Sequence, residues 1–308
     1  MNENDVKTNS ARAWMLAARP KTLTGAAVPV MIGVAMAAQA YGPALRWVPA
    51  ILCLLFAFVM QIDANFVNDY FDFMRGNDDS ATRLGPRRAC TMGWVTASAM
   101  RLAIAITTVA GCVIGLPLIW YGGWEMIMVG LLCVVFCFLY TTTLSYLGLG
   151  DVLVLVFFGF VPVCFSYYLA SPYWGGPWIQ VLTLSLACGL VIDNLLIVNN
   201  FRDIDNDRRD GKITLIVRIG HRWALRLYLL LGLVAYILVC SVGIADYLLG
   251  DRFRPLLILL PLIYVILHIA TWRRMKQIGK GRELNKVLGA TARNIFFFGL
   301  LVVLGLLM

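Results

Sequence analysis

Charged residues are scarce in this sequence. Asp, Glu, Lys and Arg make up 14% of the 308 residues, whereas 60% are hydrophobic. A water-soluble domain needs more polar groups than this to cover its surface. The shortage therefore excludes an ordinary soluble fold, and it predicts that lipid surrounds most of the chain.

Histidine is almost absent, and the cysteines form no CxxC pair. The only histidines are His221 and His268, which argues against a histidine-rich zinc or iron site. Seven of the eight cysteines fall within apolar runs, and we interpret them as small packing residues. They are Cys53, Cys112, Cys133, Cys137, Cys164, Cys188 and Cys240.

Long uncharged runs are what the sequence has in excess. A helix needs about 20 mostly apolar residues to cross the hydrocarbon core of a bilayer. The runs predict an all-α integral membrane protein with nine spans, at 23–42, 47–67, 97–119, 124–144, 152–170, 178–200, 223–245, 255–272 and 287–308. We expect one polytopic domain over 1–308, in which 1–22, 68–96 and 199–222 are cytoplasmic segments.

The basic residues predict how the chain is oriented in the membrane. Twenty-three of the twenty-six Lys and Arg residues fall in the N-terminal tail or in the segments 75–101, 202–226 and 273–293. Because cytoplasmic loops collect basic residues, the N-terminus is predicted to be cytoplasmic and the C-terminus external. No cleavable signal peptide is expected, since the basic tail leads into a span that continues into mature-looking sequence. The net charge of +9 then favours anionic lipid or a phosphorylated substrate over nucleic acid as a partner.

Acidic residues are costly beside a membrane, and nine of the seventeen gather in two clusters. The first cluster runs from Asn68 to Asp79 and is preceded by Gln61, Asp63 and Asn65, and the second runs from Asn199 to Lys212. Three pairs are four residues apart and so share a helix face: Asn65 with Asp69, Asn68 with Asp72, and Asp203 with Asp207. Oxygen pairs of this kind suit Mg²⁺, particularly where substrate phosphate completes the coordination.

Arginine and lysine are interleaved with both clusters, a pattern typical of a metal-bridged diphosphate. The alternative is that these segments are ordinary solvated loops whose charges neutralise one another. Two clusters at equivalent positions, after the second and the sixth predicted spans, favour a binding site over that alternative.

Several motifs carry a resemblance to a known family. They are ARPKTL (18–23) followed by Pro29 and Gly33, Gln61 with Asn65 and NDYFD (68–72), RLGPRR (83–88) with Gly93, YLGLGD (146–151) and RDIDNDRRDGK (202–212). The chain resembles the UbiA-type membrane prenyltransferases over nearly its whole length. RLGPRR and YLGLGD make it most similar to the menaquinone-pathway branch that uses 1,4-dihydroxy-2-naphthoate. The chain departs from the commoner form of the family's first motif at one position. That form has its last Asp where this sequence has Gly76, and Asp78 is the nearest residue that could take its place.

The resemblance implies nine helices around a central cavity that opens laterally to lipid. It also implies transfer of a polyprenyl chain from its diphosphate to 1,4-dihydroxy-2-naphthoate, with loss of the carboxylate, to give demethylmenaquinone. The reaction is expected at the inner membrane, with the site facing the cytoplasm. Rival readings are a sister enzyme that uses 4-hydroxybenzoate, homogentisate or protohaem, and a transporter or channel. The gathering of most clustered acids at one face argues against transport.

Roles can then be assigned on the matched motifs. We expect Mg²⁺ on Asn68, Asp69, Asp72, Asp203 and Asp207, with Asn65 in support, and we expect these four aspartates and Lys212 to be catalytic. The candidate diphosphate contacts are Lys21, Arg83, Arg87, Arg88 and Lys212, for which positive-inside topology is the competing explanation. An arginine of RLGPRR is a candidate partner for the carboxylate of the acceptor. Tyr140 is expected to shield the allylic cation, unless it only belongs to an interfacial aromatic belt. Asp63 and Asp193 have no role in this scheme.

Overall fold

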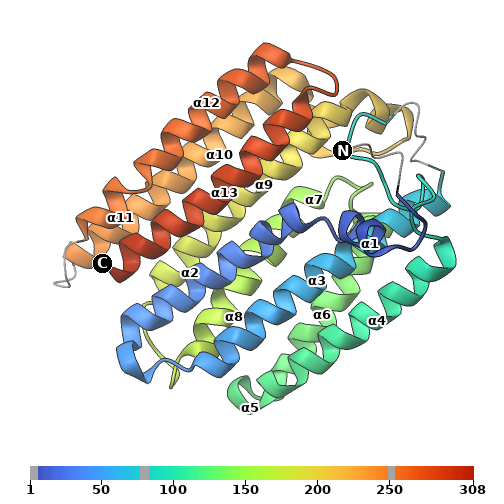
Figure 1. Cartoon of the computed structure of the whole chain (residues 1–308). Coiled ribbons are helices and arrows are strands. Elements are labelled where there is room, and N and C mark those ends of the chain that lie inside the picture. The colour runs from blue at the N-terminus through green and yellow to red at the C-terminus, as the bar shows by residue number, and fades with distance from the viewer. Residues whose placement is uncertain (1–5, 77–82, 249–253) are drawn as a thin grey trace.

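The regular structure of this protein is helical throughout the part of the chain that the computed structural model describes, residues 6–76, 83–248 and 254–308 (Figure 1). No strand occurs in those ranges. The α-helices are α1 Ala11–Ala18, α2 Leu23–Tyr41, α3 Trp47–Met74, α4 Ala97–Gly115, α5 Ile119–Gly122, α6 Glu125–Leu139, α7 Gly150–Val154, α8 Val161–Ala170, α9 Trp178–Arg209, α10 Leu215–Leu248, α11 Pro255–Leu259, α12 Leu262–Ile278 and α13 Leu284–Leu307. The helix α10 is broken at Gly220, whose φ is 76°.

Nine helical segments within the described ranges are long and apolar enough to cross a bilayer, which confirms the predicted fold class. The helices differ from the predicted spans mainly at one end of the bundle. Helix α3 continues to Met74 and α9 to Arg209, so that both acidic motifs lie on helices rather than after them. The hydrophobic runs mark where each helix is apolar, but a helix can continue past the hydrocarbon layer where neighbouring segments cover its polar end.

Helix α9 lies at the centre of the bundle. It packs against α2, α8, α10 and α13, and 72% of its most apolar stretch is buried, against 6% for α6. Gly159 and Gly189 let the chain before α8 approach α9 closely, since a Cβ atom on Gly159 would lie 2.7 Å from the Ser185 carbonyl oxygen. The second acidic motif is therefore carried by the least lipid-exposed helix.

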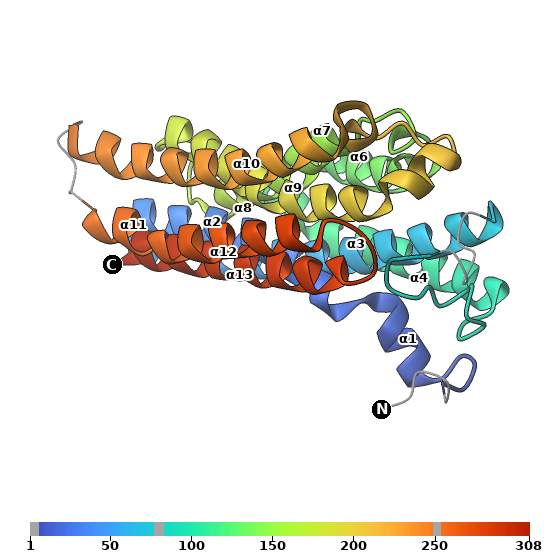
Figure 2. The ribbon, with the colours of Figure 1, turned by 90° about the horizontal axis from the view of Figure 1, so that it is seen from above.

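The short helix α1 stands off from the main bundle beside α3 (Figure 2). Trp14 of α1 packs edge-on against Phe66 of α3, with their ring centroids 5.6 Å apart. Helix α1 lies at the end of the bundle that also holds the C-terminal ends of α3 and α9. Helix α13 ends at the opposite end (Figure 1). Which end faces the cytoplasm stays a prediction.

Two π-helical segments interrupt the α-helices, at Tyr140–Leu144 after α6 and at Leu155–Phe160 between α7 and α8. Such segments are rare and occur frequently at functional sites. Neither was expected from the sequence, because an extra residue in one helical turn leaves the hydrophobic run unchanged.

Asp63 has a structural explanation in the contact between α3 and α4. Its carboxylate is fully buried and accepts hydrogen bonds from the hydroxyls of Thr107 (2.5 Å) and Thr108 (2.9 Å). Hydrogen bonds of this kind hold helices together inside a membrane. Asp63 therefore joins two helices and lies outside the acidic motifs.

We expect Asp63→Ala to destabilise the protein by about 1–2 kcal/mol and to leave the activity of the folded molecules unchanged. The replacement removes both interhelical hydrogen bonds and leaves a small gap. Thermal unfolding in detergent together with specific activity checks this, and a Thr107→Val, Thr108→Val double variant should be destabilised at least as much, because it leaves the buried carboxylate without donors. A large loss of specific activity at unchanged stability would contradict the assignment.

Candidate active site

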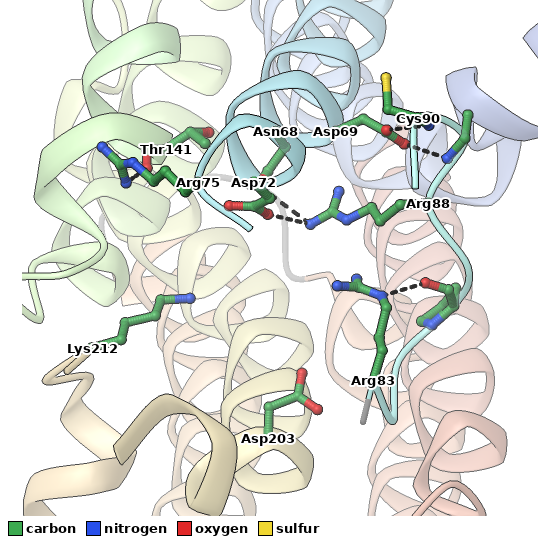
Figure 3. Close-up of polar contacts among 12 residues, drawn as sticks. Asn68, Asp69, Asp72, Arg75, Arg83, Arg88, Cys90, Thr141, Asp203 and Lys212 are labelled. Atoms are coloured by element: carbon green, nitrogen blue, oxygen red, sulfur yellow. Dashed lines mark hydrogen bonds and ion pairs between the residues drawn. The ribbon is translucent and has the colours of Figure 1, made fainter. Parts of the chain in front are cut away.

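The first motif presents two oxygen-bearing side chains from the end of α3. Arg88 donates a hydrogen bond to Asp72 Oδ2 at 2.7 Å and reaches Asn68 Oδ1 at 3.4 Å (Figure 3). One guanidinium thus joins the pair that was predicted to share a helix face. Arg88 itself is buried, so this contact is shielded from bulk water.

Asp69 points to the other side, toward the loop that follows the first motif. It is fully buried, and its two carboxylate oxygens accept hydrogen bonds from the backbone N–H groups of Ala89 (2.8 Å) and Cys90 (2.9 Å). Arg19 lies 3.8 Å from the same carboxylate. In this arrangement Asp69 fastens the loop to α3, and its predicted role as a metal ligand stays a prediction. Burial and the nearby Asp69 also raise the pKa of the Cys90 thiol to about 12.

Asn65 is engaged in a comparable anchoring contact. Its side-chain amide donates to the carbonyl oxygen of Ala18 and to the hydroxyl of Thr22, both at 2.9 Å. These bonds tie the turn before α2 to α3. The amide oxygen of Asn65 is the atom that remains for the predicted supporting contact to a metal.

The second motif lies at the end of α9, and each of its two predicted ligands has a cationic neighbour. Arg202 binds both oxygens of Asp203, at 2.9 and 2.6 Å. Lys212 Nζ lies 3.9 Å from Asp207 Oδ1. Oδ2 of Asp207 is buried and has no hydrogen-bond partner, which is costly unless a ligand completes its surroundings.

The loop after the first motif bridges the two motifs. Asn285, at the start of α13, donates to the carbonyl oxygen of Leu84 and accepts from Arg202, both at 2.8 Å. Gly85 lies directly over the Arg202 guanidinium, where a Cβ atom would be 2.7 Å from a guanidinium nitrogen. A residue larger than glycine would displace the Arg202 guanidinium or push the loop away from α9.

Arg83 lies between the two acidic motifs. Burial and the nearby Arg88 lower its pKa to about 9, while the charges of Asp203 and Asp72 act in the opposite direction. Arg83 is still protonated at pH 7. Figure 3 shows Asp72 and Asp203 on different helices around a common space into which Arg83 and Arg88 reach. One aspartate of each motif, Asp72 and Asp203, therefore lies within electrostatic range of Arg83, and that the two motifs form one site stays a prediction.

An apolar cavity of about 520 Å³ begins at this charged end and runs between α2, α3, α6, α8 and α9. Its polar wall includes Asn65, Asn68, Tyr140 and Asn199, whereas the remaining walls are largely Leu, Val, Phe, Met and Ala side chains. Such a space suits a molecule with a charged head and a hydrocarbon tail. Tyr140 lines it from the first π-helical segment.

The donor set fits a magnesium ion only if a substrate completes it. Within the described residues, no three His, Cys, Asp or Glu side chains gather closely enough to form a metal site on their own. Mg²⁺ usually takes one or two carboxylates, several waters and substrate phosphates. The paired oxygens of each motif and the partnerless oxygen of Asp207 match that pattern.

Other predicted residues are placed less centrally. Lys21 and Arg87 are exposed at the same end of the bundle. Asp78 lies outside the described residues. Asn285 and Arg19, which position the loop, lie outside both acidic clusters, and no role was predicted for them.

Arg75 also has a contact that no motif indicated. It donates to the carbonyl oxygens of Thr141 and Thr142, and its guanidinium lies 4.7 Å from the centroid of the Tyr146 ring. The end of α3 is thereby tied to the first π-helical segment. This contact helps to hold Tyr140 at the wall of the cavity.

Fold and site together define a polytopic helical membrane protein with a cluster of acidic and basic side chains at one end of an apolar cavity. The sequence profile of the UbiA prenyltransferase family matches residues 26–307, and the chain belongs to that family. This confirms the predicted resemblance.

Relatives and solved structures agree with the assignment. The chain is 37% identical over 221 residues to the 1,4-dihydroxy-2-naphthoate octaprenyltransferase of Escherichia coli, covering 68% of this chain and 69% of that protein. It is 34% identical over 257 residues to the enzyme of the same name from Mycobacterium leprae, covering 79% and 84%. Its fold is similar to that of a UbiA homologue from Aeropyrum pernix, with a TM-score of 0.67 at 18% identity over 91% of this chain and 97% of that one. A UbiA homologue from Archaeoglobus fulgidus, solved with DMAPP and Mg²⁺, has a TM-score of 0.59 at 16% identity over 94% and 98%.

Proposed function

We propose that this protein is a Mg²⁺-dependent prenyltransferase that transfers a polyprenyl chain to 1,4-dihydroxy-2-naphthoate in menaquinone biosynthesis. The carboxylate of the acceptor is lost, and the product is demethylmenaquinone. The naphthoate prenyltransferases at 31–37% identity support the acceptor. The observation that carries the proposal is the pair of acidic motifs at the mouth of the apolar cavity, joined by one arginine-rich loop.

Asn68, Asp72, Asp203 and Asp207 would hold the metal in this proposal. The homologue from Archaeoglobus fulgidus that was solved with DMAPP and Mg²⁺ supports the choice of ion. When bound, Mg²⁺ supplies Lewis-acid stabilisation of the negative charge that develops on the leaving diphosphate.

The basic residues of the chain would bind the diphosphate. Arg88 and Lys212 each lie beside an acidic side chain of the site, where they would also meet a diphosphate held by the metal. Arg83 keeps its positive charge between the motifs. Fixed cations are most effective where the negative charge of the leaving group develops. Lys21 and Arg87 would contribute from the rim of the site.

The cavity would bind the hydrocarbon tail and exclude water from the reacting carbon. Tyr140 presents an aromatic ring at the place where the allylic cation forms, and the face of an aromatic ring attracts cations. We place the site at the cytoplasmic face of the inner membrane, consistent with the distribution of basic residues. Membrane lipid is the medium from which the prenyl substrate arrives.

The direct test incubates the purified protein with 1,4-dihydroxy-2-naphthoate, a polyprenyl diphosphate and Mg²⁺, and detects the quinol product by mass. We expect product with Mg²⁺ and none after chelation, because the diphosphate is a poor leaving group without its metal. Parallel reactions contain 4-hydroxybenzoate or homogentisate in place of the naphthoate. Turnover of one of these acceptors and none of the naphthoate would reject the proposed acceptor.

A further inference from the structure

Two buried acids near Tyr140 take no part in the site described above. Asp151, at the start of α7, has 8% of its surface exposed, and Asp193, in the middle part of α9, has 3%. In each of them Oδ1 is buried and has no hydrogen-bond partner. Burying carboxyl oxygens without partners is costly, so their presence in the interior needs an explanation.

The turn that carries Asp151 is fastened to the segment after the second motif. Ile213 N–H donates to the carbonyl oxygen of Tyr146 at 3.1 Å, and Arg218 donates to that of Leu147 at 3.0 Å. Gly148 has a φ of +77°, and a Cβ atom there would lie 2.5 Å from the carbonyl oxygen of Ile213. YLGLGD thus makes a tight turn that holds Asp151 beside the end of the second motif.

A small polar cavity lies between this turn and the main cavity. Its volume is about 10 Å³, close to the space that one water molecule requires. Its polar lining comprises Tyr140, Ser145, Asp151, Asn200, Lys212 and Thr214. Tyr140 and Leu196 line both this cavity and the main one, so that Tyr140 stands between the substrate space and Asp151.

The titratable groups near Asp151 come from several elements of the described chain. Asp193 on α9 lies within electrostatic range of Asp151, and both lie within that range of Tyr140, as do Asp72 and Asp207 of the acidic motifs. Lys212 faces the same small cavity from the segment after α9. Two carboxyl groups in one buried site disfavour simultaneous ionisation, which suits a pair that accepts and returns a single proton.

We propose that Asp151, backed by Asp193, accepts the ring-hydroxyl proton of the aromatic acceptor through Tyr140 and one water molecule in the small cavity, and later returns it. The proposal rests on the proposed function. It gives the YLGLGD turn and Asp193 a role in the reaction.

The step needs no other proton donor or acceptor, because the proton that Asp151 accepts is later returned to the product. The hydroxyl O–H bond breaks, and the adjacent ring carbon that bears the carboxylate attacks the allylic carbon, so that a C–C bond forms and the C–O bond to the diphosphate breaks. The ring is then a ketone with the carboxylate on the neighbouring carbon. Loss of CO₂ returns an electron pair to the ring oxygen, which takes the proton back from Asp151.

The test compares Asp151→Asn with the wild type across a range of pH, in the purified full-length protein. At pH 7 we expect kcat to fall by about 10²-fold, a typical effect of losing a proton acceptor. The deficit should shrink as the pH approaches about 10, near the pKa of a phenol, because the hydroxyl then ionises without assistance. The affinity for polyprenyl diphosphate with Mg²⁺, measured by calorimetry, should stay within about twofold of the wild type, well below that kinetic effect.

Three further variants separate proton transfer from packing. Tyr140→Phe should show the same pH-dependent deficit, Asp151→Glu should restore part of the activity, and Asp63→Asn, a buried carboxylate elsewhere, should show no such pH dependence. A deficit in Asp151→Asn that is equal at every pH, or no deficit at all, would overturn the inference while the wild type still turns over the naphthoate. An inactive wild type would overturn the proposed function and the inference together.

Discussion

Asp72→Ala and Asp207→Ala are each expected to lower prenyl transfer by about 10³-fold or more, effectively abolishing it, while the protein still folds in detergent. Each replacement removes one predicted metal ligand from a different motif. A loss of this size corresponds to about 4 kcal/mol of transition-state stabilisation. Arg88 and Lys212 would in addition lose the acids they pair with at 2.7 and 3.9 Å.

The matched control is Asp205→Ala, which makes the same chemical change on the helix that carries Asp207. Asp205 is exposed and pairs with Lys280 at 3.2 Å, and an exposed ion pair of this kind contributes little. Activity should therefore stay close to that of the wild type in this variant. Thermal unfolding and Mg²⁺ titrations accompany the rate measurements. Near-wild-type transfer in Asp72→Ala or Asp207→Ala would remove the metal assignment.

The nine membrane segments could be predicted because the bilayer imposes a length and a composition on each of them. Helix α2, at Leu23–Tyr41, ends one residue from the predicted 23–42. Helix α3 departs by seven residues at its C-terminal end, since 67 was predicted and the helix ends at Met74. Polar residues past the apolar run do not reveal whether the backbone stays helical, because that depends on what covers them.

Residue type and spacing were enough to predict which residues belong to the site, but not how their side chains are arranged. Both acidic motifs were found because paired oxygens one turn apart are conspicuous beside a membrane. The direction in which each carboxylate points could not be predicted. Asp63 and Asp69 differ from Asp72 in their hydrogen-bond partners, which are distant in sequence. Thr107 and Thr108 bind the first, and the amides of Ala89 and Cys90 bind the second.

Asp69→Asn should distinguish an anchoring aspartate from a metal ligand. The replacement sets a side-chain NH₂ group against one of two backbone N–H donors, so that at least one charge-assisted hydrogen bond worth about 1.5–3 kcal/mol is lost. The loop that carries Arg83 and Arg88 should then loosen. We expect the affinity for polyprenyl diphosphate to fall by about 10- to 100-fold, in line with that free energy.

The Mg²⁺ dependence decides between the two roles. If Asp69 anchors the loop, the Mg²⁺ concentration that gives half-maximal activity should change little, and hydrogen exchange at residues 83–95 should become faster. Asp72→Asn, made in parallel, should raise that Mg²⁺ concentration strongly and leave exchange in the loop nearly unchanged. A rise in Asp69→Asn as large as in Asp72→Asn, without faster exchange, would restore Asp69 to the ligand set. The geometry favours the first outcome, because both oxygens of Asp69 already accept short hydrogen bonds from the backbone in a fully buried position.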